Sequence, residues 1–457
     1  MASIVTLNVS ITNAPTPSTL QGTVAIISQG ATTAPAGTLY LLTQASSLTG
    51  ILFGVLSVTT LSWSANVVTV TTTTPHGIPT GDVIRMTVAG ATPTGYNGTF
   101  SATATGASTL TYPLTPNPGS VTTPGTITFA DVAQLTAQVT TFFAQGSQTP
   151  VYILELGETA VTDGVAALTT FLNNNPATIY AVLVPREWDG NSAFMSLIAS
   201  YENPTSKFYF VVTTTTLTYS AYTPLMKCVI AGVEAPGIPS TEFSMAAELY
   251  RIASYNPSTT NKVTPNAFAF VYGVTPYPTV GNSTLLANLK AANINYIGTG
   301  AEGGITNTIF LWGVTLDGND FTYWYSVDWC QINLDLNVAN AIINGSNNPI
   351  NPLYLNQDGI NRLEAVIAST MTSAVSFGLA LGTVIQTELA SPAFLAALSS
   401  GTYAAQIAVN AVPFVTYYTL SPGDYKIGKY AGFAVSYVPA RGFINIIINL
   451  NVSTFIL

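Results

Sequence analysis

Few residues of this chain could do chemistry, and none completes a catalytic or metal-binding pattern. The single histidine, His76, stands in Pro-His-Gly, a composition typical of a turn. The two cysteines, Cys228 and Cys330, are too few for a disulfide framework, and with one histidine they make no usual zinc set. We therefore expect both cysteines to be small apolar core residues, and we expect no histidine-based catalytic triad.

Two glycine-rich segments approach the pattern of phosphate-binding loops. Residues 298–303 satisfy G-x-G-x-x-G, but residues 305–312 resemble a strand, so no helix N-terminus is offered to a pyrophosphate. Residues 423–429 nearly match a P-loop, but Tyr430 stands where Ser or Thr would hold magnesium. Pro422 and the aromatic residues around it favour a turn there.

The best carboxylate pair, Asp317 and Asp320, lies in a segment with hairpin-turn composition. Carboxylates in turns are usually solvated, so we expect no metal at this pair. The sequence predicts no catalytic residue, no cofactor and no metal ligand. This absence of chemistry favours a structural protein over an enzyme.

Charge is the most unusual property of the chain. Charged residues make up 7% of 457 residues, against a usual value of about 25%, and hydrophobic residues make up 48%. The first charged side chain is Asp82 and the last is Arg441, although the ends of a soluble domain are normally exposed and polar. We therefore expect lipid or other protein copies to cover these ends.

Lipid is the weaker explanation. The longest uncharged run without proline that suits a helix, residues 365–387, carries many Ser and Thr residues, so it predicts a buried helix and no membrane span. The first residues have neither the basic nor the apolar region of a secretory signal. The net charge of −9 and the scatter of Lys and Arg disfavour nucleic acid as a partner.

The sequence predicts a β-strand near each end of the chain. Apolar residues alternate with polar ones near both ends of the chain. The apolar faces consist of Val5, Leu7, Val9 and Ile11, and of Ile444, Ile446, Ile448, Leu450 and Val452. Neither strand carries the charges that block strand pairing, so each is either an interior strand of the chain's own sheet or a strand added to a neighbouring copy. Pro15 and Pro17 form a stiff linker after the first strand.

Between these ends the sequence predicts helices alternating with strands. Apolar residues with a helical period predict helices near 132–142, 165–172 and 194–201, the last capped by Asn191 or Ser192, with strands at 151–155, 178–184 and 208–212. Asp358 is a candidate cap for a later helix through Met371, and strand-like segments follow from residue 414. This alternation predicts an α/β or mixed α+β fold with helices on the faces of a sheet.

Residues 61–129 interrupt that pattern. They are rich in Thr, Val and Gly, and turn compositions recur between short runs of β-branched residues. We expect a small all-β module inserted in a surface loop.

Several stretches resemble contractile tail sheath proteins of phage tails and phage-derived injection particles. They are 139–146 with the strand after it, 289–298, 316–321 and 327–330, 355–363, and 437–443. The resemblance implies an N-terminal arm at 1–20 and a core at 21–60 plus 130–350, with the module 61–129 facing outward. It also implies a tube-facing domain at 351–440 and a C-terminal arm at 441–457. Pro15, Pro17 and Gly442 would then be hinges.

The resemblance implies a sheath subunit that polymerises with itself around an inner tube by strand exchange. It would meet baseplate and tail terminator proteins, contract to drive the tube through the host envelope, and belong to a virion tail assembled in the host cytoplasm. The alternative is another self-assembling structural protein of a virion or surface layer, such as a baseplate or outer-membrane-associated protein.

Overall fold

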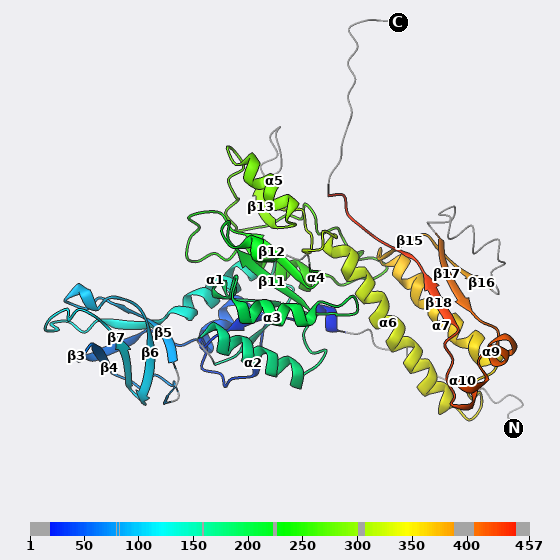
Figure 1. Cartoon of the computed structure of the whole chain (residues 1–457), viewed down its shortest axis with the longest axis horizontal. Coiled ribbons are helices and arrows are strands. Elements are labelled where there is room, and N and C mark those ends of the chain that lie inside the picture. Colours follow the sequence, from blue (N-terminus) through cyan, green and yellow to red (C-terminus); the bar gives the residue numbers. More distant parts are fainter. Residues whose placement is uncertain are drawn as a thin grey trace, which may run out of the picture. The chain divides into compact units, whose positions relative to one another are not determined.

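A computed structural model of the chain describes residues 19–78, 80–81, 83–157, 160–222, 226–299, 307–387 and 406–444. These residues form a mixed α+β fold, as the sequence predicts (Figure 1). They divide into two compact units. The larger one comprises the described parts of 20–256, 264–324 and the chain from 441, and the smaller one comprises 257–263 and the described parts of 325–440.

An eight-stranded sheet forms the centre of the larger unit. Its order is β14 (Thr308–Leu311), β13 (Asn295–Thr299), β12 (Val229–Val233), β11 (Tyr209–Thr214), β10 (Ala181–Leu183), β1 (Val24–Ser28), β9 (Val151–Glu155) and β2 (Thr38–Leu42). All neighbours pair in parallel except β13 with β14 and β9 with β2. The inner strands are fully buried because helices cover the sheet.

The helices of this unit pack on the sheet through apolar side chains. Residues of α2 (Val161–Asn174), α3 (Ser192–Tyr201) and α5 (Ser283–Ala291) share one core with the strands. The helices α1 (Ala130–Ala144) and α4 (Met245–Ser254) contact each other and the central strands β1 and β10 or β11. The predicted helices and strands of residues 130–212 are therefore confirmed. The predicted cap Asn191 is confirmed too, because its side-chain oxygen accepts from the Ala193 and Phe194 amides.

The predicted all-β module is a closed barrel of six strands. Its order is β3 (Leu56–Ser64), β4 (Val67–Thr72), β7 (Thr109–Pro113), β6 (Gly98–Gly106), β5 (Val83–Ala89) and β8 (Thr126–Phe129). Alternate residues such as Val68, Val70 and Leu110 fill its interior. The first strand begins at Leu56, five residues before the predicted insertion, and α1 follows β8 directly.

The smaller unit contains most of the long helix α6 (Phe321–Ser346), the helix α7 (Gln357–Ser376) and a three-stranded sheet. That sheet has the order β16 (Thr383–Thr387), β17 (Gln406–Ala411), β18 (Phe433–Ser436), and a short pair joins β15 (Ala380–Leu381) to β19 (Val438–Pro439). The predicted buried helix at 365–387 is confirmed only in its first part, by α7, which packs Ile360, Ile367 and Met371 inward and ends at Ser376. The second part is wrong, because β15 and β16 occupy most of residues 380–387. No helix among the described residues combines the length and hydropathy needed to cross a membrane.

Three local predictions are wrong. The cap of α7 is Asn356, whose side chain accepts from the Gly359 amide, and Asp358 lies in the first turn. Residue 414 begins the helix α9 (Phe414–Leu420) where a strand was expected, and Pro422 begins the short helix α10 (Pro422–Lys426) where a turn was expected. In the last two cases the local pattern fits two conformations, and Phe414 and Tyr418 of α9 pack against Tyr425 of α10.

Candidate functional site

The residues that could do chemistry are used for structure. His76 is buried in the barrel, where its Nδ1 accepts from the Ile78 amide at 3.1 Å. Cys228 and Cys330 are free and buried, as predicted, and burial raises the pKa of both thiols, that of Cys330 to about 12. Among the described residues, no group of three His, Cys, Asp or Glu side chains could hold a metal ion.

Open parallel sheets usually bind ligands at the carboxyl ends of the strands where the strand order reverses. In this sheet the reversal lies at β1, between β9 and β10. Gln29 follows β1, and its Oε1 accepts from Nε1 of the fully buried Trp188, which follows β10. Arg186 pairs with Glu234 through two bonds of 2.7 and 2.9 Å. At the reversal point Gln29 is thus hydrogen-bonded to Trp188, while Arg186 pairs with a carboxylate that follows β12.

The expectation for the glycine-rich segment at 298–303 agrees with the described residues, whereas the expectation for the carboxylate pair is partly wrong. Gly298 lies in β13, and the strand β14 follows, as the sequence predicts; residues 300–306 lie outside the described residues. Asp317 accepts from its neighbours Asn319 and Thr315 and from the Trp324 indole. The expectation that Asp320 is solvated is wrong, because its side chain is buried beneath the chain at Gly442.

Most of the predicted subunit-linking residues lie outside the described residues. This holds for Val5, Leu7, Val9, Ile11, Pro15, Pro17, Ile446, Ile448, Leu450 and Val452. Gly442 and Ile444 are described, and they are among the last described residues of the larger unit. The two arms therefore remain predictions, but residues 19–20 and 441–444, where they would join the rest of the chain, are described.

The C-terminal join is tightly packed. The Gly442 amide donates to Oδ2 of Asp320 at 2.8 Å, and the Arg441 guanidinium lies 4.1 Å from the centre of the Tyr323 ring. Phe443 follows and is 76% exposed. Sequence reasoning missed Asp320 and Tyr323 as contacts of this segment, because more than a hundred residues separate them from it and no local pattern links them.

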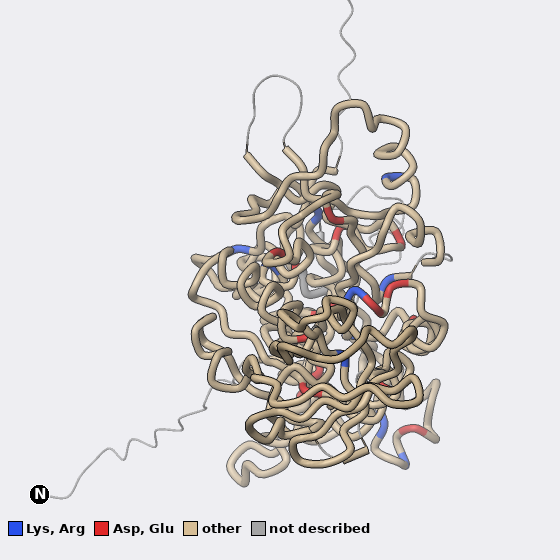
Figure 2. The backbone as a smooth tube through the Cα atoms, turned by 90° about the vertical axis from the view of Figure 1, so that its left-hand side faces the viewer, with Lys and Arg blue, Asp and Glu red and all other residues tan. Residues whose placement is uncertain are grey.

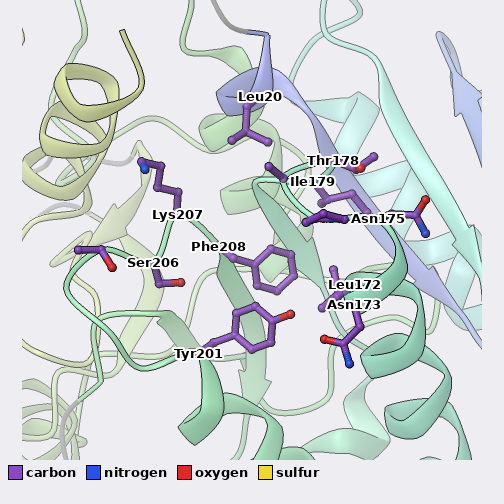
Figure 3. Close-up of a pocket in the computed structure, with 13 residues that line it drawn as sticks. Leu20, Leu172, Asn173, Asn175, Thr178, Ile179, Tyr201, Ser206, Lys207 and Phe208 are labelled. Atoms are coloured by element: carbon purple, nitrogen blue, oxygen red, sulfur yellow. The ribbon is translucent and has the colours of Figure 1, made fainter. Parts of the chain in front are cut away.

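The N-terminal join lies beside a pocket of about 410 Å³. Leu20 begins a short 3-10 helix that leads into β1, and its side chain points into this pocket (Figure 3). Apolar side chains line one part of the pocket and polar ones the rest, with Phe208 beside Tyr201 and Lys207 at the rim (Figure 3). Its lining combines apolar side chains with amide, hydroxyl and ammonium groups.

Two edge strands, β2 and β18, carry neither the charged residues nor the proline that often block strand pairing. The sequence of β2, Thr-Leu-Tyr-Leu-Leu, has no charge, and Tyr40 and Leu41 are exposed. Among the described strands, β2 pairs only with β9, and β18 pairs only with β17. Exposed apolar residues are also dense in the smaller unit on α9, α10 and the residue after it: Val415, Tyr418, Leu420, Tyr425 and Ile427.

Charged residues are sparse on the described surface, as the composition suggests. Figure 2 shows Lys, Arg, Asp and Glu as short, scattered segments of a backbone that is otherwise tan. Several of these few charges are buried: Asp131, Glu155, Lys227, Glu242, Glu248, Asp320, Asp328 and Glu364. Glu155, for example, accepts from the amides of Gly30, Thr32 and Gly157. Such a surface favours association with other protein copies.

No family model matches the sequence, and no curated protein matches it. Solved structures do match. A chain of the anti-feeding prophage baseplate aligns with a TM-score of 0.53 and 13% identity, covering 99% of this chain and 100% of that one. A chain of the contracted helical sheath of the same particle aligns with a TM-score of 0.50 and 12% identity over the same shares. The chain therefore has the fold found in contractile tail sheath proteins.

Proposed function

We propose that this chain is the structural subunit of a contractile tail sheath. In this role it polymerises with itself around an inner tube by strand exchange and contracts to drive the tube through the host envelope. The observation that carries the proposal is the likeness to a helical sheath protein over 99% of the chain. The uncharged chain ends and the sparsely charged surface support it independently.

Strand exchange is the physical basis of the proposed lattice. Four apolar side chains buried per arm, at about 1.5–3 kcal/mol each, contribute roughly 6–12 kcal/mol. Ordering roughly eight residues costs about 1–2 kcal/mol each, so the two contributions nearly cancel. Backbone pairing and the several arms of each subunit then decide whether association is favourable. An arm therefore contributes much more within a lattice than it does in an isolated contact between two subunits.

The sheet of the smaller unit is the proposed acceptor of the arms. The edge strand β18 has one partner among the described strands and no charged residue. An arm from another copy would pair with this edge through its backbone, and its alternate apolar residues would face one side of the extended sheet. The domain at 351–440 would face the tube, and the barrel would face outward.

Contraction in this proposal needs no nucleotide. The energy would be stored in a metastable extended lattice, and paired arms would keep subunits connected while their folded parts rotate. The partners are the inner tube, baseplate and tail terminator proteins, and the location is a virion tail assembled in the host cytoplasm. We assign the chain no catalytic role, since its polar groups at the strand-order reversal are paired with other side chains.

A baseplate component is the second candidate, because the baseplate chain aligns with the higher TM-score. The two roles differ in symmetry. A head-to-tail interface that closes produces a ring, and one that does not close produces a helical polymer.

Electron microscopy of the purified full-length protein tests the proposal. A sheath subunit should form tubes or long helical polymers, and a baseplate component should stop at closed rings. Removing residues 1–14, or all residues after Gly442, should leave folded subunits that no longer polymerise. A full-length protein that stays monomeric at micromolar concentration would contradict both roles.

A further inference from the structure

The first two residues of the predicted C-terminal arm, Arg441 and Gly442, are held to the larger unit. Gly442 donates its amide hydrogen to Oδ2 of Asp320 at 2.8 Å, and Arg441 stacks its guanidinium over the Tyr323 ring at 4.1 Å. All of these residues belong to the same compact unit. A charged acceptor makes this a stronger hydrogen bond than one between neutral groups.

The contact leaves no room for a side chain at position 442. A Cβ atom on Gly442 would lie 2.5 Å from Cβ of Pro265 and 3.2 Å from Oδ2 of Asp320. The first distance is shorter than any ordinary carbon–carbon contact, and a proline ring has little freedom to move away. The backbone of Gly442 therefore packs so closely against Pro265 that only a glycine fits at this position.

The acceptor itself is rigidly placed. Asp320 is 1% exposed and stands at the start of α6, where its Oδ1 accepts from the Thr322 amide at 3.2 Å. The Thr322 hydroxyl in turn accepts from the Asn266 amide, and the Asn266 side chain donates to the buried Glu248. Burial raises the pKa of Asp320, whereas the amides of Gly442 and Thr322 stabilise its charged form. Each carboxylate oxygen of Asp320 thus accepts a hydrogen bond from one backbone amide.

We infer that Asp320 is the positioning residue of the C-terminal arm. It fixes the root of the arm at Gly442, so that the arm leaves the unit from one point. This inference rests on the proposed function, and it gives Gly442 a role different from the predicted hinge. The joint that lets the arm turn then begins at the exposed Phe443. A fixed root limits the directions an arm samples and so lowers the entropy that pairing with a neighbour costs.

Two substitutions break the contact in different ways. Gly442→Ala introduces the Cβ clash and leaves α6 untouched. Asp320→Asn keeps the shape, but its amide group has one oxygen and so accepts from either Gly442 or Thr322. Gly54→Ala is the matched control, because Gly54 lies in the same unit and a Cβ there would meet nothing within 4 Å.

Trypsin provides a readout of the contact that does not depend on assembly. Arg441 is the last basic residue, so cleavage after it releases residues 442–457. The peptide bond that trypsin cuts there joins Arg441 to Gly442, the two residues held by the contact. In full-length, unpolymerised fractions, we expect Gly442→Ala and Asp320→Asn to be cleaved at this bond about tenfold faster or more than the wild type. Cleavage after the exposed Lys426 and Lys429 should keep its rate and serves as the internal reference.

Polymer formation then tests the positioning role. The two variants should polymerise at least about tenfold more slowly than the wild type and Gly54→Ala, as the lost contact predicts. Equal cleavage at Arg441 in all four proteins would overturn the inference, and so would faster cleavage with unchanged polymerisation. A wild-type protein that never polymerises would overturn the proposed function, while the cleavage rates would still decide whether Asp320 holds the arm root.

Discussion

Nη1 of Arg85 lies 2.6 Å from Oε1 of Glu187, and this ion pair joins the barrel to the sheet that it interrupts. Arg85 is on β5, and Glu187 follows β10. The same Nη1 lies 3.6 Å from Asp131, in the first turn of α1, and Gln134 donates to the second oxygen of Glu187. One cation thus lies between two carboxylates, and the barrel has a defined polar contact with the core.

Removing that cation should destabilise the protein. In Arg85→Met, the buried Asp131 loses its neighbouring cation, and its Oδ2 already has no hydrogen-bond partner, so the carboxyl group must either stay charged without a counter-ion or take up a proton. We expect a loss of about 1–3 kcal/mol in the free energy of unfolding at pH 8, less than for a fully buried pair because Arg85 is partly exposed. Urea denaturation measures it. Adding Asp131→Asn should recover part of the loss; a double variant no more stable than Arg85→Met would show that the two side chains are not coupled.

Asp131 should also make stability depend on pH. Burial raises the pKa of Asp131 to about 7, with Arg85 acting in the opposite direction. The folded state therefore binds the proton more tightly than the unfolded state, so the stability from this group is present at acidic pH and lost as pH rises through about 7. Asp131→Asn should gain stability over the wild type between pH 5 and pH 8.5. An unchanged difference across that range in thermal melts would contradict the raised pKa.

Deleting the barrel should leave the rest of the protein folded if the deletion begins and ends at residues that are paired across two strands. Leu56 pairs with Ile127, so residues 55 and 128 are close enough for a short Gly-Ser bridge. Deleting 56–127 together with Asp131→Asn should give a soluble protein that still polymerises, because the proposed outward position of the barrel leaves it few lattice contacts. A deletion that ends within β3, such as 62–128, leaves part of an unpaired strand and serves as the contrast. Loss of polymers in the first deletion, seen by electron microscopy, would place the barrel in the lattice.

Charges on the predicted C-terminal arm should abolish assembly without unfolding the subunit. Ile446→Lys with Ile448→Lys places two ammonium groups on the apolar face of this arm, and burying an unpaired charge costs several kcal/mol. Circular dichroism and the melting temperature should stay unchanged, and polymers should be missing at every salt concentration, because desolvation is not screened. Loss of helix signal would mean that the strand belongs to the subunit's own core, and normal polymers would contradict strand exchange.

The sequence alone predicts those features that depend on residues close to one another along the chain. The helical period of α1 to α3, the cap Asn191 and the turns and short strands of the all-β module depend on residues close in sequence, and the sequence predicts all of them. The closure of that module into a barrel pairs residues as distant as Leu56 and Ile127 and was not predicted. The charge-free ends were also visible without a structure, because composition does not depend on folding.

Only the tertiary structure decided where distant residues meet. Asp320 lies in a segment that looks like a solvated turn, and its burial follows from the return of the chain 122 residues later, where the Gly442 amide meets it. Arg85 and Glu187 are 102 residues apart, and nothing local in either segment indicates the other. A hydrogen bond or ion pair depends on distance in space, and only the packed sheet and helices bring these groups within reach.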